Sequence, residues 1–122
     1  MMPNQSLTAI VVSHNSAGVL PACLAALRRE GVPVLVVDNA SRDDTLSVAR
    51  RFGATVIANA KNEGYGRANS LGVQAAGTEF CLILNPDIVL DEGTVKALLA
   101  AAGRYPDAGM WAPAIIETDG RF

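Results

Sequence analysis

The sequence predicts an α/β domain with an open, mostly parallel, doubly wound sheet. Apolar segments suited to strands begin roughly 25 residues apart, which is the length of one strand plus one helix in a βαβ unit. None of these segments alternates polar and apolar residues, so they suit a parallel sheet that is covered on both faces. The intervals between them carry apolar residues at helical spacing.

The expected strands cover residues 8–12, 34–37, 55–58 and 80–84, with a fifth at 110–116. Pro113 interrupts the fifth segment, which favours an edge strand or a bend. Connections between parallel strands of one sheet are right-handed, and we expect that hand here. The last residues, "ETDGRF", resemble the turn of a hairpin whose second strand is absent, so we expect the chain to be truncated.

Four helices are expected in the intervals. The first covers about residues 17–29, where three leucines fall at helical spacing. The second begins at Ser41, which forms an S-x-x-D pattern with Asp44 like that of a capping box, and it ends before Gly53. The third covers about residues 66–76, and the fourth about residues 91–104.

Length and charge exclude several classes of protein. The 122 residues make one domain, or a piece of one, and no segment is apolar for long enough to span a bilayer. Ten basic against twelve acidic residues leave a formal charge of −2, which gives no basic surface for nucleic acid. No basic stretch precedes the first apolar run, so we do not expect a signal peptide.

The cysteines and the paired arginines have structural interpretations. Cys23 and Cys81 lie in apolar stretches without the spacing of metal ligands, which indicates buried free thiols in a reducing compartment such as the cytoplasm. Both Arg-Arg pairs, at 28–29 and 50–51, fall near the ends of expected helices, where cations complement the helix dipole.

Polar residues follow the expected strands where each one ends. Open α/β sheets bind ligands outside the carboxyl ends of their strands, although surface loops are polar in any case. The residues at these ends are Ser13, His14, Asn15, Asp38, Asn39, Asn59, Asn85, Pro86 and Asp87.

Asp38 directly follows an apolar strand and could accept hydrogen bonds from a ribose hydroxyl or a base N–H. The alternative is a carboxylate that caps the second helix. Ser41 stands at the better capping position, which favours the binding role for Asp38.

Asp87 could hold Mg²⁺ or Mn²⁺, because these ions take oxygen ligands and bridge to substrate phosphates. Pro86 restricts the backbone and therefore the direction of that carboxylate. The alternative is an ordinary surface turn, since Asn, Pro and Asp are all turn formers.

The stretch "NEGYGRAN" at residues 62–69 contains two glycines, Gly64 and Gly66, that let the backbone approach a ligand. The helix after them would present free N–H groups to an anion, although a simple loop-to-helix turn explains the pattern equally well. His14 is the only histidine, and without a recognisable partner we expect it to line the pocket or to pack beside it.

Several nucleotide-binding motifs are absent from the sequence. It has no G-x-x-x-x-G-K-[ST], and the turn after the first strand, "SHNSAGVL", lacks G-x-G-x-x-G. That turn also lacks the Gly-rich loop with Arg and Lys of a sugar nucleotidyltransferase and the acidic pair of a receiver domain.

Four motifs together resemble the family-2 inverting glycosyltransferases, which have the GT-A fold. They are "TAIVVSHN", "VLVVDNASRDDT", "NEGYGRANSLGVQAA" and "LILNPDIVLDEGTVKALL", in the family's order and at its spacing. The resemblance covers most of residues 8–99 and implies that the chain is the N-terminal nucleotide-sugar-binding portion of a longer GT-A domain. The "LNPDI" form is most similar to the branch that includes rhamnosyltransferases using dTDP-rhamnose.

The resemblance also implies a role for each motif. Ser13, His14 and Asn15 would border the base. Asp38 would bind the base or ribose, supported by Asn39 and Ser41. The remaining residues expected to line the nucleotide-sugar pocket are Gly64, Gly66, Asn69 and Asn85.

Asn85-Pro86-Asp87 matches the family's D-x-D metal motif, with Asn85 in place of the first Asp. One carboxylate, Asp87, is left to bind Mg²⁺ or Mn²⁺ directly. Asn85 could ligate through its carbonyl oxygen, or donate to a phosphate or a sugar hydroxyl.

An inverting transfer needs a general base, usually Asp or Glu, and in the family this base lies beyond the end of this chain. The carboxylates downstream of Asp87 are Asp91, Glu92, Glu117 and Asp119, and none of them is assigned that role. The catalytic residue is therefore unknown from this sequence.

Two functions follow from the resemblance. The first is the donor-binding domain of a glycosyltransferase that uses a dTDP- or UDP-sugar and a carbohydrate or lipid-linked acceptor. The second is a nucleotide-binding or protein-interaction module without turnover. Family members with lipid-linked acceptors often work at the inner face of a membrane. Because a truncated sheet leaves an open edge, we also expect the chain to self-associate.

Overall fold

The computed structural model describes residues 6–121. The first five residues, which bear on the expectation about a signal peptide, and Phe122 lie outside this range. The elements in chain order are β1 (Leu7–Ser13), α1 (Leu20–Arg29), β2 (Val34–Asn39), α2 (Thr45–Arg51), β3 (Thr55–Asn59), α3 (Tyr65–Ala76), β4 (Phe80–Leu84) and α4 (Thr94–Arg104).

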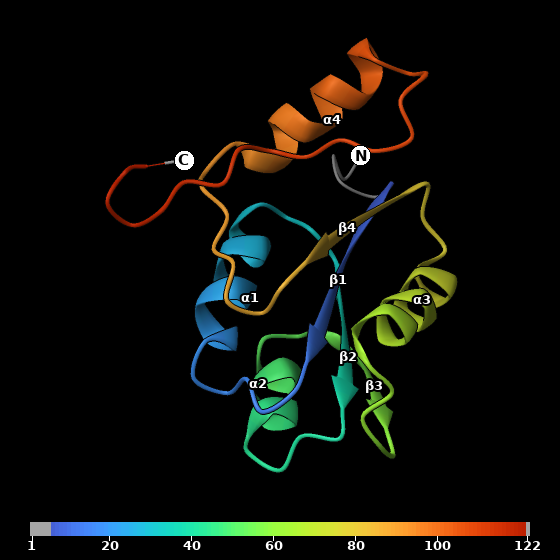
Figure 1. Cartoon of the computed structure of the whole chain (residues 1–122), viewed down its shortest axis with the longest axis vertical. Helices are drawn as coiled ribbons and strands as arrows, with labels where there is room; N and C mark the ends of the chain where they lie inside the picture. Colours follow the sequence, from blue (N-terminus) through green and yellow to red (C-terminus); the bar gives the residue numbers. More distant parts are fainter. Residues whose placement is uncertain (1–5, 122) are drawn as a thin grey trace. The chain divides into compact units, whose positions relative to one another are not determined.

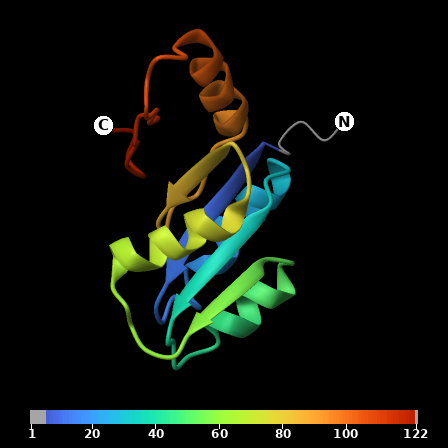
Figure 2. The same ribbon diagram turned by 90° about the vertical axis from the view of Figure 1, so that its right-hand side faces the viewer.

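The chain divides into two compact units, one ending at Leu90 and the other beginning at Asp91. The first unit holds the sheet, in which four parallel strands take the order β3-β2-β1-β4. Helices α1 and α2 lie on one face of this sheet and α3 lies on the other (Figures 1 and 2). The α/β fold class with a parallel, doubly wound sheet is therefore confirmed, whereas the expectation of one domain over residues 1–122 stays a prediction.

The centre of the sheet forms the core. All seven residues of β1 are buried, and the large apolar side chains Ile10, Val12, Leu35 and Val37 pack with Ala68 of α3. The prediction of strands covered on both faces holds for β1 and β2. It fails for the outer strands β3 and β4, in which most residues are partly or fully exposed.

Gly72 sets the distance between α3 and the sheet. A Cβ atom at this position would lie 2.5 Å from Cγ2 of Ile10 and 3.2 Å from Cγ2 of Val37. Only a glycine therefore allows α3 to pack this closely against β1 and β2.

Helices α1 and α2 begin a few residues later than predicted. Helix α2 begins at Thr45 and not at Ser41, and its N-cap residue Asp44 makes no side-chain cap bond. Helix α1 begins at Leu20, after a turn in which the Ser16 carbonyl accepts from Val19 and Leu20. Both arginine pairs do lie in the last turns of α1 and α2, as predicted.

The second unit contains α4 and an irregular segment, so the strand predicted at residues 110–116 is wrong. No strand forms there within the described residues, and Met110, Ile115 and Ile116 are exposed. A strand needs a hydrogen-bonded neighbour, and Pro113 lacks the N–H that such a ladder requires. The expected turn does form, because the Glu117 amide donates to the Arg121 carbonyl over 2.7 Å.

No helix within residues 6–121 combines the length and the apolar character needed to cross a membrane. Both cysteines are free thiols, as predicted. The predicted burial is confirmed for Cys23 and is wrong for Cys81, which is half-buried because it lies in the outer strand β4.

Candidate functional site at the carboxyl edge of the sheet

The strand order places a topological switch between β1 and β4. From β1 the chain proceeds outward through β2 to β3, and then α3 returns it across the opposite face to β4 on the other side of β1. Ligands of open α/β sheets bind in the crevice outside the carboxyl ends of the strands at such a point. Because Val11 pairs with Leu84, the loops that begin at His14 and Asn85 leave adjacent strands at this edge.

Asp38 is buried at the carboxyl end of β2 and is bonded on both oxygens. Its Oδ1 accepts from the hydroxyls of Ser13 at 2.8 Å and Ser41 at 2.6 Å, and its Oδ2 accepts from the Ser41 amide at 2.9 Å. The predicted cap residue Ser41 therefore bonds Asp38 and does not cap α2. With only 1% of its surface exposed, Asp38 joins β1 to the turn after β2.

Asn39 connects three segments of the edge. Its backbone carbonyl accepts from Nδ1 of His14 at 2.7 Å. Its side-chain oxygen accepts from Nδ2 of Asn59 at 2.9 Å and from the Glu63 amide at 3.3 Å, while its Nδ2 donates to the Gly64 carbonyl at 3.2 Å. Asn39 is buried, so these bonds hold the loop before α3 against the ends of β2 and β3.

His14 and Asn15 are the exposed residues of this network. Asn15 adopts a left-handed backbone with φ 50°, its amide donates to the Ser41 hydroxyl at 2.8 Å, and its Oδ1 accepts from the Arg42 amide at 2.8 Å. The ring of His14 is fixed at Nδ1 by Asn39 and lies 3.3 Å from Nδ2 of Asn15. The structure thus brings Ser13, His14, Asn15, Asp38 and Asn39 together in one ordered edge, and their role in binding a nucleotide sugar stays a prediction.

Residues that the sequence reasoning missed complete this edge. The Ser16 amide donates to the Thr45 hydroxyl at 2.8 Å, and the Ala17 amide donates to Oδ2 of Asp43 at 3.1 Å. The Thr45 hydroxyl also donates to Asp43, and this bond is the main cause that lowers the pKa of the Asp43 carboxyl. In the sequence, the polar "SRDDT" stretch could have indicated these hydrogen bonds, but the partners of Asp43 and Thr45 lie 26 to 29 residues away.

The loop before α3 places Gly64 at the N-cap with φ 86°, a backbone that favours glycine. Gly66 differs in that its backbone φ is not positive, and a Cβ at that position would meet no atom within 4 Å. Packing therefore does not explain Gly66, and the first turn of α3 has open space beside it.

Asn69 lies one turn further along α3 and is 8% exposed. Its Oδ1 is buried and has no hydrogen-bond donor within the described residues. A buried amide oxygen without a partner is costly, so it is a position where a donor from a ligand or a water would be favourable.

Asn85, Pro86 and Asp87 form a β-turn that is closed by the Ile88 amide, which donates to the Asn85 carbonyl at 3.1 Å. The turn interpretation of this stretch is therefore confirmed, and the metal role of Asp87 stays a prediction. Asn85 and Asp87 are both exposed.

Two residues of α1 contact the segment of residues 85–90, and the sequence did not predict either contact. Cys23 lies beneath it, with Sγ 3.9 Å from the Asn85 carbonyl oxygen. Burial, together with the nearby charge of Asp87, raises the pKa of the Cys23 thiol to about 11. Arg29 donates from Nη2 to the Leu90 carbonyl at 2.6 Å.

No cluster of three or more His, Cys, Asp or Glu side chains suited to a metal ion occurs within residues 6–121. Asp87 with Asn85 nevertheless fits a cation that is shared with a phosphate, because Mg²⁺ is usually held by one or two carboxylates plus substrate oxygens.

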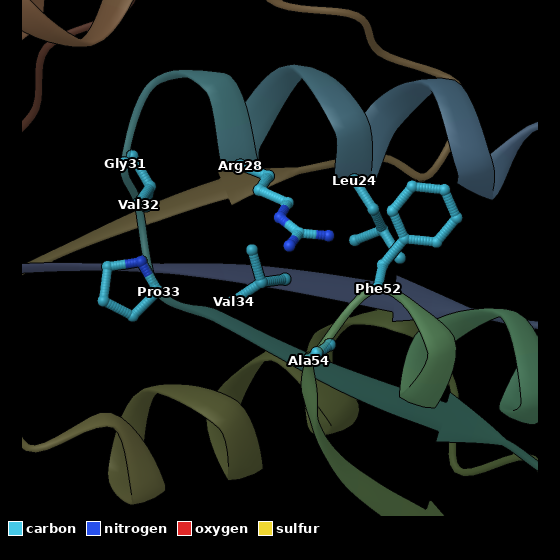
Figure 3. Close-up of a pocket in the computed structure, with 9 residues that line it drawn as sticks. Leu24, Arg28, Gly31, Val32, Pro33, Val34, Phe52 and Ala54 are labelled. Atoms are coloured by element: carbon cyan, nitrogen blue, oxygen red, sulfur yellow. The ribbon is translucent and has the colours of Figure 1, made fainter.

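A cavity of about 280 Å³ lies elsewhere, near the amino ends of the strands (Figure 3). It is lined by residues at the end of α1, the start of β2 and the end of α2, among them Arg28, Pro33 and Phe52. Because the polar strand ends are at the opposite edge of the sheet, this cavity is separate from the candidate site.

Comparison with known proteins gives a family match. The model of the family described as "Glycosyl transferase family 2" matches residues 8–122. An uncharacterized glycosyltransferase of Mycobacterium bovis is 38% identical over 106 residues, which cover 87% of this chain and 48% of that protein. An N-acetylglucosaminyl-diphospho-decaprenol L-rhamnosyltransferase of Mycobacterium tuberculosis is 30% identical over 130 residues, covering 93% of this chain and 42% of that protein.

The fold has solved counterparts. Glucosyl-3-phosphoglycerate synthase from Mycobacterium tuberculosis, in complex with Mn²⁺, UDP and glucosyl-3-phosphoglycerate, superimposes with a TM-score of 0.67 at 17% identity. The match covers 80% of this chain and 39% of that one. The chain thus spans less than half the length of the proteins described here that it matches.

Proposed function

This chain belongs to glycosyl transferase family 2, and we propose that it is the donor-binding part of an enzyme that transfers a sugar from a nucleoside diphosphate to an acceptor hydroxyl with inversion. The observation that carries the proposal is that two polar loops leave adjacent strands at the switch between β1 and β4. One loop presents His14 and Asn15, and the other presents Asn85 and Asp87.

The two loops suit different parts of a nucleoside diphosphate sugar. The loop after β1 is rigid, since Asp38 and Asn39 hold it through buried hydrogen bonds, and a rigid polar edge suits a base and a ribose. On this view Asp38 positions Ser13 and Ser41, and the residues that contact the nucleotide are the exposed ones beside it. The open space beside Gly66 and the unpartnered Oδ1 of Asn69 support a nucleotide-sugar pocket that includes these two residues.

The exposed turn suits the diphosphate. Within residues 6–121, no hydrogen bond or ion pair engages the side chains of Asn85 and Asp87, so both are available to a cation or a phosphate. Asp87 would be the carboxylate ligand of Mg²⁺ or Mn²⁺, with the Asn85 amide oxygen beside it. When bound, such a cation neutralises charge on the leaving diphosphate.

The identities of the sugar and of the acceptor are more specific proposals. The name of the mycobacterial rhamnosyltransferase supports a rhamnosyl donor and a lipid-linked acceptor. We propose dTDP as the carrier of that rhamnose. The fold counterpart in complex with UDP supports a uridine nucleotide instead. A general base is not assigned in residues 6–121, and we place it in the part of the relatives that this chain does not span.

One observation favours a second candidate, which is a nucleotide-binding or protein-interaction module without turnover. Asn85 leaves the turn with a single carboxylate, so the cation would be held less tightly than by two.

Calorimetric titration with dTDP and with UDP, each with and without Mn²⁺, tests the proposal. We expect binding that Mn²⁺ strengthens and that Asp87→Ala reduces to its metal-free level. Glu79→Ala is the matched control, because this exposed carboxylate lies just before β4, at the opposite end of that strand from Asp87. Binding of neither nucleotide under any condition would contradict a donor site in this chain, and binding without metal dependence would support the second candidate.

A further inference from the structure

The loop of residues 85–90 contains no helix or strand, yet helix α1 contacts it at both ends. At its start, the Asn85 carbonyl lies 3.9 Å from Sγ of the buried Cys23. At its end, the Leu90 carbonyl accepts from Arg29 at 2.6 Å. Asp87 lies between these two points.

The Arg29 bond is the stronger of the two contacts. It is charge-assisted and short, whereas a thiol is a weak donor at a longer distance. If the Arg29 guanidinium were removed, the Leu90 carbonyl would lose its hydrogen-bond donor. Because Leu90 is buried, water would replace this donor poorly.

The neighbouring arginine shows that this contact is specific. Arg28 lies in the same last turn of α1 and complements the helix dipole equally well. Its guanidinium, however, extends into the cavity beside Val34 and Phe52 (Figure 3). The dipole therefore accounts for a cation at either position, but it does not account for the bond from Arg29 to Leu90.

We propose that Arg29 is a positioning residue for Asp87: by holding Leu90 it keeps the 85–90 loop in the conformation that presents the Asp87 carboxylate. This proposal rests on the function proposed above, because it assigns Arg29 a part in holding the cation and diphosphate. A ligand whose supporting contacts are fixed before binding loses less freedom when the metal arrives.

The first test needs no ligand. The ¹⁵N heteronuclear NOE of residues 86–89 should fall in Arg29→Gln, which loses the cation but keeps a polar side chain of similar length. The NOE of these residues should remain at the wild-type value in Arg28→Gln. In Arg29→Lys it should lie between the values of the wild type and of Arg29→Gln. An unchanged NOE in Arg29→Gln, or an equal loss in Arg28→Gln, overturns the proposal. If Arg29→Gln does not fold, the comparison is made with Arg29→Lys, for which a partial fall is expected.

The second test measures UDP affinity with and without Mn²⁺. In Arg29→Gln the gain in affinity that Mn²⁺ provides should shrink by about tenfold, while the metal-free affinity stays unchanged. A fall in both affinities together would indicate a structural defect and overturn the positioning role. If wild-type protein shows no Mn²⁺-dependent gain, the function proposed for Asp87 fails, and with it the role of Arg29 toward the metal; the NOE then decides by itself whether Arg29 orders the loop.

Discussion

The hydroxyl of Ser13 donates a 2.8 Å hydrogen bond to Oδ1 of Asp38, its register partner in the neighbouring strand. The ends of β1 and β2 are thus joined through side chains as well as through the backbone. Since Ser41 also donates twice to Asp38, one buried carboxylate orders both loops that leave these strands.

We expect Asp38→Ala to destabilise the protein by about 2–4 kcal/mol without any ligand present, because it leaves the buried hydroxyl of Ser13 and the half-buried donors of Ser41 without an acceptor. Urea unfolding measures this. Asp44→Ala is the control, an exposed carboxylate nearby that makes no side-chain cap bond to α2. Unchanged stability in Asp38→Ala would show that its network is not structural and would favour a direct role in binding.

We expect the two glycines of α3 to respond in opposite directions. Gly72→Ala places a Cβ against the stiff, fully buried Ile10 and should destabilise by about 1–3 kcal/mol. Gly66→Ala meets open space and should stabilise the helix by up to about 1 kcal/mol. If the open space beside Gly66 receives the nucleotide, the same variant binds UDP more weakly. Thermal unfolding and titration on the two variants check both statements, and equal stability changes would contradict the packing argument.

We expect Asn69→Ala to change the stability of the free protein by less than about 1 kcal/mol, because its buried Oδ1 has no partner to lose. Affinity for the nucleotide should nevertheless fall, since a ligand donor would lose its acceptor. Gln74→Ala, an exposed amide of the same helix, should leave both quantities unchanged. A large loss of stability with no loss of affinity would assign Asn69 to the fold alone.

We expect Asp43 to contribute to acid sensitivity. Its pKa in the folded protein is lowered from the ordinary value of 3.8, chiefly by the bond from the Thr45 hydroxyl, so folding favours the charged form. This contribution is complete above the unfolded pKa and is lost as the pH falls through the lower folded value. The stability difference between wild type and Asp43→Asn should therefore shrink as the pH falls below about 4. Denaturant unfolding at several pH values measures it, and a difference that is the same at every pH would contradict the mechanism.

We expect self-association through the edge strand β4. Within the sheet, β4 pairs with β1 on one side only, and its residue Ile83 is 48% exposed. Unpaired edges with apolar side chains favour pairing with another chain. Sedimentation over a concentration series should show an oligomer that Ile83→Lys abolishes, with Val73→Lys on the exposed part of α3 as control. A monomer at every concentration would contradict this prediction.

The order of the helices and strands in the first unit could be predicted from the amino-acid sequence alone. Apolar runs and helical spacing are local properties, so β1 to β4 and their helices could be predicted within a few residues. Local patterns failed where a distant partner decides. The segment at 110–116 has strand composition but no neighbouring strand within the described residues. Ser41 does not cap a helix, because its hydroxyl accepts from the Asn15 amide, 26 residues away, and donates to Asp38.

The contacts that stabilise the candidate site could be known only from the three-dimensional arrangement of the elements. The strand order puts Asn85 beside the end of β1, and Arg29 meets Leu90 across 61 residues of sequence. Neither contact produces a periodic pattern in the amino-acid sequence, because each depends on which elements pack together. For the same reason Asp87 could be proposed as a site residue from the sequence, whereas the contacts of Cys23 and Arg29 with its loop could not be predicted.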